Sequence, residues 1–76
     1  MSKRLPVVSG RDCVKALSKA GFYFVRQKGS HMYLRRDDPF AQISVPDHRE
    51  LDRGTLKSIL RQADITIEDL VDLLKN

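Results

Sequence analysis

The sequence predicts an α+β fold in which helices pack on one face of a three-stranded antiparallel sheet. Apolar residues recur at helical spacing near both ends of the chain, around residues 10–20 and 53–74. Between them, residues 22–45 hold three short runs rich in aromatic and β-branched residues, separated by two turn signals. A length of 76 residues leaves room for one domain, spanning 1–76, with a thin core.

The first helix is expected to begin after Ser9. Ser9 is followed three residues later by Asp12, a pattern related to the capping box. The apolar face that follows comprises Cys13, Val14, Leu17 and Ala20. Gly21 then ends the helix as a C-terminal capping glycine. Cys13 is the only cysteine, so we expect it to pack in the core rather than to act as a nucleophile.

Three strands are expected next, joined as a meander. Their predicted ranges are Phe22–Lys28, His31–Arg36 and Phe40–Val45. Gly29-Ser30 forms the first turn and Asp37-Asp38-Pro39 forms the second, while Pro46 ends the last strand.

The C-terminal third contains two more helices after a polar loop at 47–52. The stripe of the second helix comprises Leu56, Ile59, Leu60 and Ala63, and that of the third, which starts at Thr66, comprises Ile67, Leu70, Val71 and Leu74. The resulting order, α-β-β-β-α-α, is the outline of a double-stranded-RNA-binding domain.

The first hairpin allows the two sheet faces to be assigned. A two-residue turn at Gly29-Ser30 pairs Lys28 with His31 and, further along, Phe24 with Arg35. One face then holds Phe24, Arg26, Lys28, His31, Tyr33 and Arg35. The other holds Tyr23, Val25, Met32 and Leu34, joined by Ile43 and Val45. The second set is the expected core, so the first set faces solvent.

The solvent-facing set combines cations for phosphates with aromatic rings on which bases stack. This composition is typical of a platform for single-stranded RNA. An ordinary outer sheet face, on which Lys, Arg and Tyr are common, is the alternative.

His31 adds the possibility of cleavage. RNA carries its own nucleophile in the 2′-hydroxyl, and an imidazole can move protons at neutral pH. A lone exposed histidine can equally be a simple surface residue. The predicted face holds no Asp or Glu, and Asp37, Asp38 and Asp47 are interpreted as turn formers, so we expect neither a metal nor another cofactor.

Charge is divided unevenly along the chain. Residues 1–36 carry nine Lys or Arg against one acid, a surplus of +8, whereas residues 37–76 have a net charge of −4. A basic half beside an acidic half favours a polyanionic ligand, although scattered surface charge remains possible. We expect a cytoplasmic location, because the basic start leads into no apolar signal segment.

Several of these motifs together resemble the HicA mRNA interferase family. The resemblance rests on Gly21-Phe22, on Gly29-Ser30-His31 with Tyr33, on Val45-Pro46-Asp47-His48, and on the segment from Gly54 to Ile65. It covers roughly residues 9–74.

This resemblance implies a toxin that cleaves messenger RNA, with His31 as the catalytic residue. It also implies a HicB antitoxin that covers this histidine. Gly29 and Ser30 are expected to position the turn, and His48 to form a loop hydrogen bond. Arg53, Lys57 and Arg61 form a basic stripe, either a second RNA contact or a plain solvent face. A non-catalytic RNA-binding module and a domain that binds only an acidic protein are the alternative functions.

Overall fold

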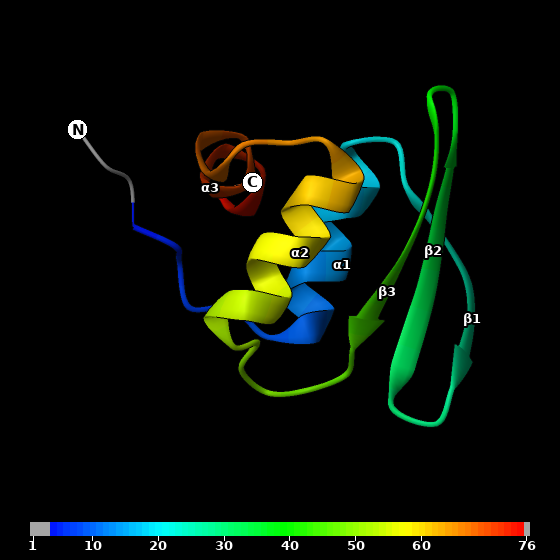
Figure 1. Cartoon of the computed structure of the whole chain (residues 1–76), viewed down its shortest axis with the longest axis horizontal. Coiled ribbons are helices and arrows are strands. Elements are labelled where there is room, and N and C mark those ends of the chain that lie inside the picture. The colour runs from blue at the N-terminus through cyan, green and yellow to red at the C-terminus, as the bar shows by residue number, and fades with distance from the viewer. Residues whose placement is uncertain (1–3, 76) are drawn as a thin grey trace.

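The computed structural model describes residues 4–75 and has the predicted order of elements. These are α1 (Gly10–Lys19), β1 (Tyr23–Lys28), β2 (His31–Asp37), β3 (Phe40–Pro46), α2 (Arg53–Ala63) and α3 (Ile67–Leu74). The strands form one antiparallel sheet in the order β1-β2-β3. The helices lie on one side of the sheet, where α2 packs against β3 and α1 contacts both β1 and β3 (Figure 1). The α+β prediction is confirmed.

Local capping explains where the helices begin. The Ser9 side chain accepts a hydrogen bond from the Asp12 backbone N–H at 3.0 Å, and Asp52 caps α2 in the same way through Thr55. Thr66 and Asp69 form a reciprocal capping box at α3. Because each cap satisfies backbone N–H groups that have no partner within the helix, the cap residues mark the helix starts in the sequence.

The core lies between the helices and strands β2 and β3, which supply its buried sheet residues. Met32 and Leu34 of β2 and Ile43 and Val45 of β3 are buried, as predicted. They pack with the buried side chains of the helices, which include Leu17, Leu56, Ile59 and Leu70. Cys13 is also fully buried, and this burial raises the pKa of its thiol to about 11. The thiol is therefore protonated at neutral pH and acts as a packing residue, as predicted.

The pairing of β1 with β2 differs from the prediction beyond its first two pairs. Lys28 pairs with His31 and Arg26 with Tyr33, as expected, but a β-bulge follows at Val25. Phe24 consequently pairs with Leu34, and the predicted pairing with Arg35 is wrong. One extra residue exchanges the faces of the residues beyond it.

Tyr23 and Val25 are not core residues, contrary to the prediction. Each is 43% exposed, and every residue of β1 is exposed. The helices bury alternate residues of β2 and β3 but bury no residue of β1. None of the helices in the described part of the chain has the length and hydrophobicity to span a membrane.

Candidate functional site

The sheet surface turned away from the buried core is called the open face here. Cross-strand pairing arranges it in rows: Lys28, His31 and Pro46; Arg26, Tyr33 and Ser44; Tyr23, Arg35 and Gln42. Directly paired residues of antiparallel strands point to the same side. Of the predicted set, five residues therefore lie on this face, and Phe24 lies on the other.

His31 stands at one end of the open face, at the start of β2. The turn before it uses Gly29 with a φ of +59°, a conformation that glycine adopts without strain. The side chain of His31 is exposed, and its cross-strand neighbour is Lys28. An ammonium group and an imidazole therefore share one row of the sheet.

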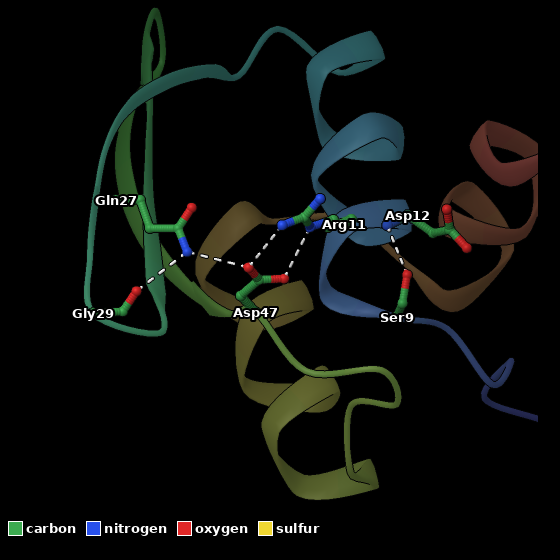
Figure 2. A network of polar contacts seen from close by, with 6 residues as sticks. All are labelled: Ser9, Arg11, Asp12, Gln27, Gly29 and Asp47. Atoms are coloured by element: carbon green, nitrogen blue, oxygen red, sulfur yellow. Dashed lines mark hydrogen bonds and ion pairs between the residues drawn. The ribbon is translucent and has the colours of Figure 1, made fainter.

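Asp47 ties this turn to the rest of the molecule (Figure 2). Its backbone N–H donates to the carbonyl of Ser30 at 2.6 Å. Its carboxylate accepts hydrogen bonds from Arg11 at 3.1 and 3.3 Å and from Gln27 at 3.1 Å. The bonds from Arg11 and then Gln27 lower the pKa of Asp47 below its ordinary value. The prediction that Asp47 is only a turn former was incomplete, because Asp47 joins α1, β1 and the turn.

Two cations and a ring surround a hollow farther along the open face. Its volume is about 530 Å³, and its lining includes Arg26, Tyr33 and Arg35. The guanidinium carbon of Arg26 lies 5.5 Å from the centroid of the Tyr33 ring, within cation–π distance. The Nε of Arg35 is buried and has no hydrogen-bond partner among residues 4–75. The protein itself thus leaves the Arg35 cation incompletely satisfied.

The open face is not free of carboxylates, contrary to the prediction. Asp37 belongs to β2 rather than to the turn, and its carboxylate accepts a hydrogen bond from the Tyr23 hydroxyl at 2.8 Å. Asp37 lies at the opposite end of β2 from His31. Among residues 4–75, no three His, Cys, Asp or Glu side chains gather into a metal-binding group.

Two further sets of predicted residues lie away from His31. His48 is exposed, and the hydrogen bond in its loop uses its backbone carbonyl, which accepts from the Gly10 N–H at 2.8 Å. Arg53, Lys57 and Arg61 are exposed on α2. The residues of α2 that line the hollow beside His31 lie on another flank of the helix and include Thr55, Ser58 and Gln62.

The polar residues of that flank, together with Ser44, were missed from the sequence. Ser44 was within reach of prediction, because it alternates with Ile43 and Val45 and must therefore face away from the core. Thr55, Ser58 and Gln62 had no comparable signal. Their position beside His31 depends on how α2 packs against β3, which no local pattern specifies.

The fold and the open face together define a class of protein. The order α-β-β-β-α-α, with helices on one side of the sheet, is that of the double-stranded-RNA-binding-domain-like α+β folds. A family model described as HicA toxin of bacterial toxin–antitoxin matches residues 10–65. The chain therefore belongs to the HicA toxin family. No curated protein matches it.

Membership of this family makes the chain a toxin of a toxin–antitoxin system. It implies an antitoxin partner and an RNA target. The matched residues include His31, the turn before it, and all three strands.

Proposed function

We propose that this toxin is an endoribonuclease that cuts messenger RNA, with His31 as its acid–base residue. The observation that carries the proposal is the placement of an exposed histidine in one row with Lys28, on a face that also holds Arg26 and Arg35. Proton transfer and charge stabilisation are what cleavage of RNA by its own 2′-hydroxyl requires.

The reaction is a transesterification that divides one RNA strand into two fragments. The 2′-oxygen attacks the adjacent phosphorus, the bond from phosphorus to the 5′-oxygen breaks, and the products carry a 2′,3′-cyclic phosphate and a 5′-hydroxyl. His31 takes the 2′ proton or donates a proton to the leaving 5′-oxygen. Lys28, which shares its row with His31, stabilises the extra negative charge on the phosphorane, and Arg35, two rows away, holds a neighbouring phosphate. Because the substrate supplies the nucleophile, the step needs no metal or other cofactor.

RNA binding is assigned to the side chains that share the open face with His31. They are Arg26, Lys28, Tyr33 and Arg35, with Gly29 and Ser30 holding the turn. Phe24 is not part of this assignment, because its pairing with Leu34 puts it on the other face. The placement of Arg35 beside Arg26 in the lining of one hollow supports the assignment, since an anionic ligand there would contact both cations.

The antitoxin is proposed to be HicB-like and to cover the open face. This face is the exposed side of the sheet and carries the cations assigned to RNA binding. An acidic or blocking segment placed there would hide His31 and compete with RNA in a single contact.

The test compares the native protein with His31→Ala on a short RNA in the presence of EDTA. A strand with a 2′-deoxy residue at the cut site is the substrate control, and His48→Ala is the protein control. We expect cleavage with a cyclic phosphate product, an intact deoxy strand, and a loss of about 10²–10⁴-fold in rate for His31→Ala. Near-native cleavage by His31→Ala would remove the catalytic assignment. Inhibition by EDTA or a 5′-phosphate product would reject the mechanism.

A further inference from the structure

A second hollow lies beside His31, between strand β3 and helix α2. Its volume is about 470 Å³, within the usual range of roughly 300–1,000 Å³ for small-molecule sites. The sheet contributes His31, Ser44 and Pro46 to its walls, and α2 contributes Thr55, Ser58 and Gln62. This hollow is called the α2 groove below.

The polar groups of the α2 groove have a defined orientation. Nε2 of Gln62 donates to Oγ of Ser58 at 3.0 Å. This bond leaves Oε1 of Gln62 as an acceptor and the Ser58 hydroxyl proton as a donor toward a ligand. The hydroxyl of Thr55 donates to Asp52 at 2.6 Å and so serves the cap of α2. Gln62 and Ser58 are therefore the pair available for recognition.

The α2 groove also differs in charge from the hollow next to it. The described residues that line the groove include no Lys or Arg, whereas Arg26 and Arg35 line the neighbouring hollow. Ser44 and Gln62 line both, so the two hollows adjoin. A phosphate next to the scissile one suits the cationic hollow. Asp52 also lines the groove, but both of its carboxylate oxygens accept hydrogen bonds from Thr55. The remaining polar groups suit the edge of a base, with Pro46 as an apolar surface for the ring.

We propose that the α2 groove binds the nucleobase that flanks the scissile phosphate, and that Gln62 and Ser58 select which base is accepted. The inference rests on the proposed function, because His31 defines where the scissile phosphate lies. A neighbouring acceptor and donor match bases that present a donor beside an acceptor on one edge. Single-stranded RNA exposes such edges, since its bases are not paired.

The experiment measures binding and cleavage in parallel. Four short RNAs, one for each base and each protected by 2′-O-methyl groups against cutting, are titrated into the ¹⁵N-labelled protein. A randomised RNA pool is cleaved separately, and the bases at the cut ends are counted. Gln62→Leu and Ser58→Ala are the test variants. Lys57→Ala, on another flank of α2, is the matched control.

We expect the native protein to rank the four RNAs by affinity and to shift the Gln62 side-chain amide signal on binding. Gln62→Leu should reduce the difference between the best and worst base by about 5-fold or more, as should Ser58→Ala. Lys57→Ala should keep the native ranking. The cut-end preference in the pool should change in the same two variants.

Equal affinities for the four RNAs in the native protein, or a native ranking in Gln62→Leu and Ser58→Ala, would overturn the proposal. A protein that ranks the bases through Gln62 but does not cut the pool would support base selection and contradict only the ribonuclease assignment. Cleavage with unchanged base preference in the two variants would support the ribonuclease assignment and contradict base selection by Gln62 and Ser58.

Discussion

Gly10 lies at the point where α1 meets the loop that follows β3. Its N–H donates to the carbonyl of His48, and a Cβ at this position would overlap the backbone carbonyl of Pro46. Pro46 directly precedes Asp47, which holds the turn before His31. The absence of a side chain at Gly10 therefore lets α1 come close to the loop that supports the site.

Replacing Gly10 with Ala should destabilise the protein by about 1–3 kcal/mol, because the backbone must shift to admit the methyl group. Urea unfolding measures the loss. Gly54→Ala is the control, since a Cβ there meets only the Asp52 carboxylate at ordinary contact distance and the helix gains propensity. Equal stability of Gly10→Ala and the native protein would show that the close approach is not required.

Individual residues near the turn could be predicted where the pattern is local. The pairing of Lys28 with His31 followed from a two-residue turn and is confirmed. The carboxylate of Asp47 bonds to Arg11, which is 36 residues away in sequence. No spacing rule indicates such a partner, so the turn could be predicted and its anchor could not.

In strand β1, the register could be predicted from the sequence only for the residues near the turn. Tyr23, Phe24 and Val25 are three consecutive aromatic or β-branched residues, and such a run fits either register of a strand equally well. Only the alternation of Arg26, Gln27 and Lys28 nearer the turn is set by the hairpin. The bulge at Val25 lies beyond the residues whose register the hairpin turn determines. Helix boundaries were more predictable, because caps are formed by residues three positions apart.

The hairpin between β1 and β2 should loosen in acid. The pKa of Asp47 is lowered by its hydrogen bonds with Arg11 and Gln27. The contribution of Asp47 is therefore complete above the ordinary carboxyl pKa of about 4 and is lost as the pH falls through the lowered value. Amide chemical shifts of Gly29 and Ser30, followed by NMR from neutral pH downward, should titrate below pH 4.

In Asp47→Ala the same two amide signals should lack this transition and should resemble the acid form already at neutral pH. Asp37→Ala, at the other end of β2, is the control and should keep the native titration. A native titration of Gly29 and Ser30 in Asp47→Ala would show that another group controls the turn.

At the scale of the whole molecule, the basic and acidic parts of the sequence lie on different elements of the fold. The +8 surplus of residues 1–36 includes the cations of the open face, whereas most acids lie in the loops and in the helices that follow the sheet. That helices would cover one face was predictable from their apolar stripes. How far they extend across the sheet was not, because it depends on packing between distant segments.

RNA binding should depend on salt with a log–log slope of about −2, the value for roughly three phosphate contacts to a single strand. Fluorescence anisotropy from low to moderate salt measures the slope. The triple alanine variant of Arg26, Lys28 and Arg35 should bind weakly and with a flatter slope. The triple alanine variant of Arg53, Lys57 and Arg61 removes the same charge elsewhere and should bind nearly as the native protein does. Equal losses in both variants would contradict a localised contact.

The antitoxin should protect residues 24–35 from hydrogen exchange in the complex, because this segment holds the turn, His31 and the cations assigned to RNA. The complex should also unfold at a higher temperature than the free toxin, as for any partner that binds only the folded state. Hydrogen exchange measured by mass spectrometry compares the protection of this segment with that of the rest of the chain in one experiment. Protection confined to α3 would place the antitoxin elsewhere.

The exposure of every residue of β1 favours local opening of this strand. β1 buries no side chain, whereas β2 and β3 supply four residues to the core. Separation of β1 from β2 therefore costs less free energy than global unfolding and defines a small cooperative unit of low stability. Opening of this unit removes Arg26 and Lys28 from the site while His31 stays with the core. An anion that contacts both strands binds only when β1 is paired with β2. Its binding therefore stabilises that pairing, and its affinity depends on how often the pairing is formed.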